Sequence, residues 1–254
     1  MSKIVSATAP GKTILFGEHA VVYGRPAIAV PVFQVRAKAT IEPRDDGRVE
    51  IDAVDIRRKY DLTDASEGDP IAAIIRLTCA KLGVEPKNFG VQIQSTLPIG
   101  GGLGSGAAVS VAIARALGRF FATDASRTGS TKKEKMKENT ATGHTENTRT
   151  KKIYSVSPVR EASVAMLSNE EISTLAYEVE KLHHGTPSGI DNTVIAYEQP
   201  VYFVRGRPIQ SFRVARPFTI AIADTGIAAP TKIAVGDVRR AWEADRVRYE
   251  ALFD

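Results

Sequence analysis

A run rich in glycine, from Pro98 to Gly106, precedes an apolar stretch from Ala107 to Leu117. The first amides of a helix have no partner within the helix, and with the helix dipole they favour an anion in front of it. Glycine lets the main chain approach phosphate oxygens without an intervening side chain. A tight strand-to-helix turn is the alternative, but it rarely needs five glycines within seven residues. The run therefore predicts a phosphate-binding loop.

Spacing excludes two better-known phosphate loops. Gly11-Lys12-Thr13 looks like the end of a Walker A loop, but Ser6 stands where that loop has its first glycine. Gly102-Leu103-Gly104 with Ala107 fits the loose dinucleotide pattern, but no βαβ unit closed by an acidic residue follows it. The glycine run is therefore a different kind of phosphate loop.

Lys12, Glu18 and His19 lie within one short stretch whose other residues are largely apolar. Charged side chains are costly to bury unless they are paired. An ordinary loop with solvated charges is the alternative. We favour a functional site, because charged groups enclosed by apolar neighbours gather at such sites.

Two carboxylates further along the chain suit phosphoryl transfer, which needs neutralised charge, a held metal and a positioned hydroxyl. Glu180 is suited to Mg²⁺, which prefers one or two carboxylates plus phosphate oxygens, although a solvated helix residue is the alternative. Asp191 follows Gly189 in a polar turn, where it can orient or deprotonate a substrate hydroxyl or simply form an Asx turn. No Ser-His-Asp order and no zinc-ligand spacing competes with this set.

Composition limits the class of protein. The chain has 254 residues, 43% of them hydrophobic, so it can bury a sizeable core in one large or two small domains. No apolar run approaches the roughly 18 residues of a membrane span, and the first residues lead into a predicted strand and not into a signal peptide. We therefore expect a soluble cytoplasmic protein. The single cysteine, Cys79, excludes an intramolecular disulfide, and its apolar neighbours indicate packing.

The net charge of +5 comes from one segment. Residues 127–160 hold nine Lys or Arg against three Glu, so the rest of the chain is nearly neutral. From about Thr123 to Ala165 apolar residues are few, which predicts a disordered insertion. A basic arm for nucleic acid or an anionic membrane is one alternative, but Tyr154 is its only interleaved aromatic residue. A sequencing or gene-model artefact is another. We expect neither a nucleic-acid nor a membrane partner.

Strands and one helix are expected ahead of the glycine run. Strand patterns occur at Ile4 to Ala9, Ala27 to Val30, Val35 to Glu42 and Val91 to Gln94. Asp69 to Leu82 has helical apolar spacing, and Pro70 suits the first turn of that helix. The helix after the glycine run is apolar nearly all round, so it should lie in the middle of the core.

Order is expected again from Ser168. Ser168 and Glu171 fit a capping box, so a helix should begin there and end at Gly185. Glu180 and His184 lie four residues apart and share one face of this helix. Strands are predicted near Val194 to Ala196, Val201 to Val204 and Phe218 to Ala223, followed by an amphipathic helix from Trp242 to Phe253.

Taken together, these motifs resemble the GHMP kinases. The resemblance covers Ile4 to Val30, Pro98 to Leu117, Ser168 to Val204 and Asp224 to Lys232. It implies a two-domain α+β fold, the GHMP kinase fold, with an N-terminal domain like domain 2 of ribosomal protein S5. The likeness is greatest to members that phosphorylate mevalonate. It implies transfer of phosphate from ATP to the C5 hydroxyl of (R)-mevalonate, giving 5-phosphomevalonate for isoprenoid synthesis, with phosphomevalonate or a sugar as alternative acceptors.

The functional residues of the family map onto this sequence by position. The catalytic aspartate corresponds to Asp191, and the active-site lysine, implied to activate the hydroxyl and stabilise developing charge, corresponds to Lys12. The Mg²⁺ ligand corresponds to Glu180, with Ser105 as a second ligand. Substrate-side or supporting roles are implied for Glu18, His19 and His184. The ATP loop maps onto Pro98, Ile99, Gly100, Gly101, Gly102, Leu103, Gly104, Ser105, Gly106, Ala107 and Ala108.

The sequence departs from the family in three places. Gly106 stands where many relatives have a metal-contacting serine, so Ser105 or water is expected to take that role. The segment 123–165 lies where relatives usually have a short connection. A third glycine-rich motif near the C-terminus is missing, so we expect an incomplete C-terminal domain.

We accordingly predict an ATP-binding domain over residues 1–166 and the start of a second domain over residues 167–254. The expected partners are ATP and mevalonate, with a homodimer as one assembly that fits. An inactive nucleotide-binding fragment is the alternative to a kinase.

Overall fold

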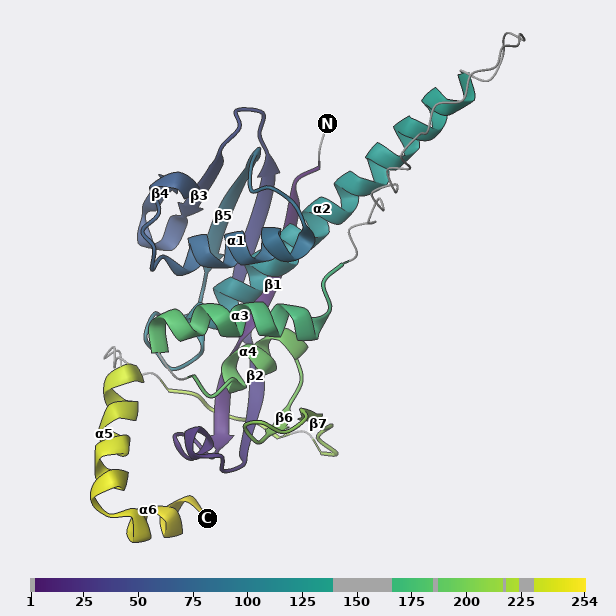
Figure 1. The fold of residues 1–254 in the computed structure, drawn as a ribbon. Helices are drawn as coiled ribbons and strands as arrows, with labels where there is room; N and C mark the ends of the chain where they lie inside the picture. The colour runs from purple at the N-terminus through teal and green to yellow at the C-terminus, as the bar shows by residue number, and fades with distance from the viewer. Residues whose placement is uncertain (1–2, 139–165, 185–186, 217, 224–230) are drawn as a thin grey trace, which may run out of the picture.

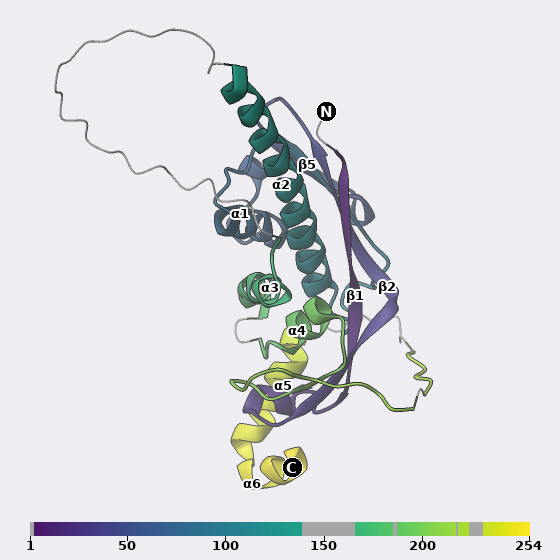
Figure 2. The ribbon, with the colours of Figure 1, turned by 90° about the vertical axis from the view of Figure 1, so that its right-hand side faces the viewer.

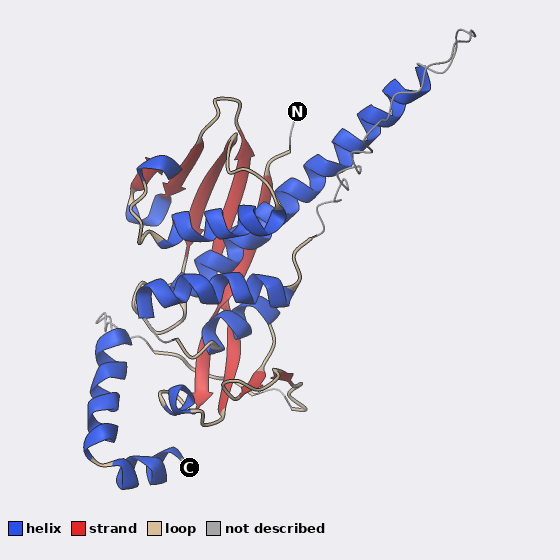
Figure 3. Cartoon of the chain, in the orientation of Figure 1, coloured by secondary structure: helices blue, strands red, loops and turns tan. Residues whose placement is uncertain are grey.

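A mixed β-sheet forms one layer of the molecule, and helices cover one of its faces (Figure 2). The computed structural model describes residues 3–138, 166–184, 187–216, 218–223 and 231–254 (Figure 1, Figure 3). The seven strands within these ranges are β1 (Val5–Phe16), β2 (Ala27–Pro43), β3 (Val49–Ala53), β4 (Arg58–Asp61), β5 (Phe89–Ser95), β6 (Val201–Phe203) and β7 (Gln210–Ser211).

The described helices are α1 (Pro70–Leu82), α2 (Ser105–Glu138), α3 (Asn169–His184), α4 (Ile190–Tyr197), α5 (Thr231–Ala244) and α6 (Arg246–Phe253). Three short 3₁₀ turns accompany them: η1 (Ala20–Tyr23), η2 (Val54–Ile56) and η3 (Leu62–Asp64). Strands and helices thus mix along the chain as expected for an α+β fold.

The long strand β2 organises the sheet. It pairs antiparallel with β1, with β5 through residues 37–43 and with β6 through residues 27–29. Ala37, Ala39 and Ile41 are fully buried, whereas the intervening Lys38 is exposed, because successive strand residues point to opposite faces. The two predicted strands at 27–30 and 35–42 are therefore parts of one strand.

The helix α2 lies in the core, as its composition predicts. Val111, Ile113 and Leu117 are fully buried, and α2 packs on β1 and β2 on one side and on α1 and α3 on the other. The window Ser105–Ala122 is also long and apolar enough to span a membrane by length and composition. The expectation that no run approaches that length is therefore wrong. Since 61% of the window is buried inside the protein, its role as a core helix accounts for its composition.

Two of the predicted helix starts, at Asp69 and at Ser168, are confirmed. Asp69 caps α1, because its Oδ1 accepts hydrogen bonds from the amides of Ile71 and Ala72 at 2.9 and 3.0 Å. At α3 the Ser168 amide donates to Glu171 Oε2 at 2.9 Å, and the Glu171 amide donates to Ser168 Oγ at 3.2 Å. This is the reciprocal capping box.

The expectation of disorder from Thr123 is wrong in its first part. The helix α2 continues to Glu138 and extends away from the body of the molecule (Figure 1). Lys and Glu, which are good helix formers, are frequent in its last turns, from Lys132 to Glu138. The rest of the predicted insertion, residues 139–165, lies outside the described residues.

Three other predictions after residue 185 are wrong. Val194 to Ala196 belongs to the helix α4, and residues 218–223 form no strand. The predicted helix from Trp242 to Phe253 is split between α5 and α6, because Asp245 caps a new helix by accepting from the Arg248 amide at 3.1 Å. The strand near 201–204 is confirmed as β6.

One apolar core joins both sides of the predicted domain boundary at residues 166/167. It contains Ile41, Val111 and Leu117 together with Ala176, Val179 and Ile195 from α3 and α4. Cys79 is buried in this core, which raises the pKa of its thiol to about 12 and fits the expected packing role. The two-domain division itself stays a prediction.

Candidate active site

Lys12 lies just after an irregularity in β1. The register with β2 shifts between Pro10 and Gly11, and such a bulge re-aims the side chains that follow it. The Lys12 side chain is 6% exposed, and its Nζ lies 3.2 Å from Asp191 Oδ1. A buried ammonium needs such a partner, because its desolvation would otherwise be costly.

The glycine run lies directly on Lys12. The Lys12 amide donates to the carbonyl of Leu103 at 3.0 Å, which joins the loop to β1. Gly104 has φ +74°, and a Cβ there would lie 3.0 Å from Ile195 Cδ1 and 3.1 Å from Lys12 Cγ. Both the backbone conformation and the lack of space therefore require glycine at this position.

The helix α2 begins at Ser105, immediately after Gly104. The first helical hydrogen bond at this end runs from the Ala108 amide to the Gly104 carbonyl at 2.9 Å. The amides of residues 105 to 107 precede that bond, so they are available to an anion in front of the helix. The main chain here has the form that the sequence predicts for a phosphate loop.

Asp191 lies in the first turn of α4, after Gly189 with φ +91°. Its side chain is 31% exposed, so one of its faces remains accessible while Lys12 occupies the other. Ile190 and Val194, on the same helix, are buried against Val21 and Ala29 in a second apolar cluster. This packing fixes the start of α4 beside β1.

Glu180 lies on α3 and is 6% exposed. The pKa of its carboxyl group is raised to about 7, mainly by burial and also by the charge of Asp191, while Lys12 opposes the shift. A Cβ added at Gly106 would lie 3.3 Å from Glu180 Oε1. The carboxylate therefore faces the first turn of α2, where the free amides lie.

Four elements thus converge: β1 with Lys12, the glycine loop, α3 with Glu180 and α4 with Asp191. A cation, two carboxylates and a set of main-chain amides are the groups that phosphoryl transfer to an alcohol requires. These residues lie far apart in the sequence, and the fold brings them together as predicted.

Several known proteins resemble this chain in sequence and in fold. The family model described as GHMP kinases N terminal domain matches residues 70–145, from α1 through the glycine loop into α2. The mevalonate kinase of Thermococcus sibiricus is 31% identical over 253 residues, covering 94% of this chain and 62% of that protein. The mevalonate kinase of Bos taurus is 28% identical and covers 94% of this chain and 63% of that protein.

This chain is similar to mevalonate kinases in sequence and has the GHMP kinase fold. In the structure of L. major mevalonate kinase in complex with R-mevalonate, the matching chain has a TM-score of 0.60 at 24% identity, covering 100% of this chain and 68% of that one. The Methanococcus jannaschii mevalonate kinase structure matches with a TM-score of 0.57 at 22% identity, covering 84% of this chain and 56% of that one. The chain spans 62–63% of the length of the relatives from Thermococcus and Pyrococcus.

No contact with the Lys12–Asp191 pair is described for the other residues mapped from the GHMP kinases. Glu18 is exposed, so the inference that it is buried with Lys12 is wrong, because the loop after β1 turns outward there. His19 is partly buried and has φ 62°, a left-handed conformation that is uncommon outside glycine. His184 is the last residue of α3, and its side chain lies outside the described part of the chain.

The ends of the mapped ATP loop differ in exposure. Ile99, Gly100 and Gly102 are exposed, whereas Ala107 and Ala108 are buried in α2. Ser105 is the first residue of that helix, and its side chain is partly buried. The roles predicted for these residues stay predictions.

Sequence reasoning missed one contact beside Asp191. The side-chain amide of Asn192 donates to the carbonyl and to Oγ of Ser173 at 3.0 and 2.9 Å, which joins α4 to α3. Asn192 and Ser173 are both buried. The signal for Asn192 was a polar residue at the start of an otherwise apolar helix, whereas nothing in the sequence marked Ser173.

The carboxylates of the site suit a divalent cation whose coordination shell is completed by oxygen atoms of the substrate. Among the described residues, no group of three or more His, Cys, Asp or Glu side chains is close enough to hold a metal alone. Glu180 and Asp191 offer carboxylate oxygens, which Mg²⁺ prefers, and Mg²⁺ commonly takes its other ligands from phosphate and water. The raised pKa of Glu180 means that burial disfavours its charged form, which a bound cation would favour.

Proposed function

We propose that the chain transfers the terminal phosphate of ATP to the C5 hydroxyl of (R)-mevalonate, giving 5-phosphomevalonate. The observation that carries the proposal is the buried Lys12–Asp191 pair at 3.2 Å, packed against the glycine loop and facing Glu180. The mevalonate kinase relatives supply the acceptor, because a charged pair and a phosphate loop alone suit many small alcohols.

Each residue has a task in this proposal. The amides at the start of α2 bind the phosphates of ATP. The free face of the Asp191 carboxylate accepts a hydrogen bond from the substrate hydroxyl and takes its proton as the oxygen attacks phosphorus. Lys12 orients Asp191 and stabilises the negative charge that develops on the attacking oxygen.

Mg²⁺ is the cation we propose for this site. Glu180 would hold it from α3, with Ser105 or water completing the protein side because Gly106 has no hydroxyl. When bound, the ion would neutralise charge on the phosphates. We also propose that the protein works in the cytoplasm.

Two kinds of likeness support the proposal. The Thermococcus sibiricus relative is named a mevalonate kinase, and the L. major structure holds R-mevalonate. The chain spans about 63% of the length of such relatives, so its activity as it stands belongs to the proposal.

The decisive experiment measures ADP release from ATP, Mg²⁺ and mevalonate with the purified chain. We expect Asp191→Ala to lower turnover about 10³-fold, since loss of a general base commonly costs that much. Asp45→Ala, in the exposed turn between β2 and β3, is the matched control and should leave turnover unchanged. Undiminished turnover in Asp191→Ala would refute the assigned role.

An acceptor panel separates the proposal from its alternatives. Phosphomevalonate and galactose test whether the acceptor is another small alcohol. Nucleotide binding without transfer to any acceptor would instead support a binding protein, an alternative that Gly106 favours because it removes a hydroxyl beside Glu180.

A further inference from the structure

Arg115 makes a three-way contact behind the site. It lies on α2, about 15 Å along the helix from Ser105 at 1.5 Å per residue. Its Nη1 donates to the carbonyl of Thr8 on β1 at 2.9 Å and to Glu198 Oε1 at 2.5 Å. Its Nη2 donates to the carbonyl of Ala196 on α4 at 2.7 Å. The side chain is only 12% exposed, so water competes little for these bonds.

Two of the three acceptors, Glu198 and the Ala196 carbonyl, lie at the C-terminal end of α4, the helix that carries Asp191 at its start. The Ala196 carbonyl is in the last turn, where carbonyl groups lack partners within the helix and favour a cation. Glu198 ends α4 with φ 54°, a left-handed conformation that costs free energy in a residue other than glycine. The ion pair with Arg115 offsets that cost and fixes where α4 stops.

The three joined elements are those that carry the site. Thr8 is four residues before Lys12 on β1, Arg115 shares α2 with the glycine loop, and Ala196 is five residues after Asp191 on α4. Figure 2 shows α4 lying beside β1 and the first half of α2. Apolar packing of Ile190 and Val194 fixes the start of α4, and the bonds of Arg115 add a polar attachment at its other end.

We infer that Arg115 is a positioning residue for the phosphoryl transfer proposed above: by holding the end of α4 against β1 and α2, it fixes the Asp191 carboxylate beside Lys12. The predicted effect of Arg115 on kcat rests on the proposed function. The structural consequence of the inference, the coupling between Arg115 and Asp191, does not depend on activity.

The first experiment compares Arg115→Met with Arg76→Met, a control in which an arginine on α1 loses its bond to the Leu62 carbonyl, 2.8 Å long, away from the site. We expect Arg115→Met to lower kcat about 10- to 100-fold, because displacing a catalytic group by about 1 Å has effects of that size. KM for the alcohol should change less than kcat, and Arg115→Lys should restore part of the loss. Arg76→Met should leave kcat unchanged.

A second background separates positioning from general loss of structure. In Asp191→Asn, which lacks the group being positioned, Arg115→Met should cause no further loss of the residual turnover. Arg115→Met should nevertheless still lower the unfolding midpoint in the Asp191→Asn background. A loss of kcat of equal size in both backgrounds would overturn the inference, as would a normal kcat in a destabilised Arg115→Met.

Unfolding in urea tests the inference even if the chain transfers no phosphate. If Arg115 holds Asp191 beside Lys12, Asp191→Asn should shift the unfolding midpoint more in the unchanged chain than in Arg115→Met or Arg115→Lys. Equal shifts would contradict the positioning role. A chain with this coupling but no transfer to any acceptor would refute the proposed function alone.

Discussion

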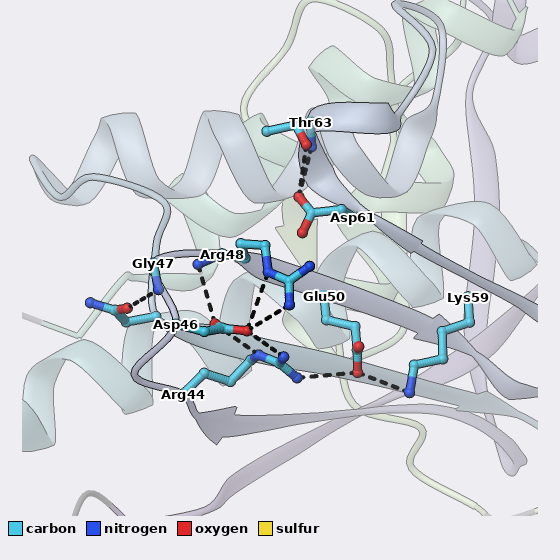
Figure 4. A network of polar contacts seen from close by, with 9 residues as sticks. Arg44, Asp46, Gly47, Arg48, Glu50, Lys59, Asp61 and Thr63 are labelled. Carbon is cyan, nitrogen blue, oxygen red and sulfur yellow. Dashed lines mark hydrogen bonds and ion pairs between the residues drawn. The ribbon is translucent and has the colours of Figure 1, made fainter.

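Charged side chains gather in two regions of this protein, and the two regions handle charge in opposite ways. The site holds Lys12 and Glu180 in the interior, next to the partly exposed Asp191. The surface network lies on the exposed side of the β2–β3 turn and comprises Arg44, Asp46, Arg48, Glu50 and Lys59 (Figure 4).

In the surface network every carboxylate contacts two cations. Arg44 forms a two-bond contact with Asp46 at 2.6 and 3.2 Å, and Arg48 contacts the same carboxylate. Glu50 Oε1 lies 3.3 Å from Arg44 Nη1 and 3.0 Å from Lys59 Nζ. The hydrogen bonds from Arg44 hold the pKa of Asp46 well below its ordinary value.

In the site two carboxylates, Glu180 and Asp191, both interact with the ammonium group of Lys12 and with each other. Burial and Asp191 raise the pKa of Glu180 to about 7. A carboxyl group whose pKa is strongly raised by burial and by a neighbouring carboxylate is typical of a functional site. Its place beside the glycine loop supports the proposed Mg²⁺.

Removing the ammonium group of Lys12 should have the largest effect. In Lys12→Met the neighbouring carboxylates lose their partner, and we expect turnover to fall about 10²- to 10³-fold, as when one donor to developing charge is lost. The free energy of unfolding should fall by about 2 kcal/mol, below the usual cost of breaking a buried pair because Asp191 is partly exposed.

Lys59→Met is the matched control for that change, since Lys59 pairs with Glu50 at the surface. It should leave both turnover and the urea midpoint close to those of the unchanged chain. Similar losses in the two variants would remove the distinction between the two regions.

The dependence of stability on pH should differ in sign between the regions. The Glu180 pKa is about 7 in the folded chain against an ordinary 4.5, so the protonated group stabilises the fold. This contribution is complete below pH 4.5 and is lost as pH rises to about 7, amounting to about 3 kcal/mol.

Urea unfolding at a series of pH values, in the presence of a chelator, measures this contribution. Glu180→Gln cannot titrate, so its stability should fall less over that range than that of the unchanged chain. Asp46→Asn is the opposite control: because the Asp46 pKa is lowered, its contribution is present above the ordinary value and is lost on acidification. If stability fell equally with pH in the unchanged chain and in Glu180→Gln, the raised pKa of Glu180 would be contradicted.

Local signals were sufficient for much of the fold and part of the site. The capping box at Ser168, the proline start of α1 and the glycine loop depend on neighbours in the sequence, so they could be read directly. The meeting of Lys12, Glu180 and Asp191 could not be derived from spacing. It was expected only through the resemblance to the GHMP kinases.

The wrong predictions have a common physical cause: contacts between segments that are distant in the sequence decided the local structure. Val194 to Ala196 is a short apolar run, and periodicity alone cannot separate a strand from a buried helix turn. Here Ile195 packs against Gly104, which favours the helix α4. Residues 218–223 alternate like a strand, but no described strand pairs with them. Arg115 was invisible for the same reason, because its partners are backbone carbonyls from distant segments.

The smallest predicted effect is the influence of salt concentration on the stability that each of the two regions contributes. The surface network attracts its ions through water, and at about 1 M salt the screening length falls to about 3 Å. Asp46→Asn should therefore lower the urea midpoint slightly at low salt and not at all at high salt. Asp191→Asn, which removes the charge paired with Lys12, should shift the midpoint by the same amount in both conditions because protein shields that pair. If salt cancelled both shifts alike, the Lys12–Asp191 pair would be as solvated as the surface, and the electrostatic argument for the site would lose its basis.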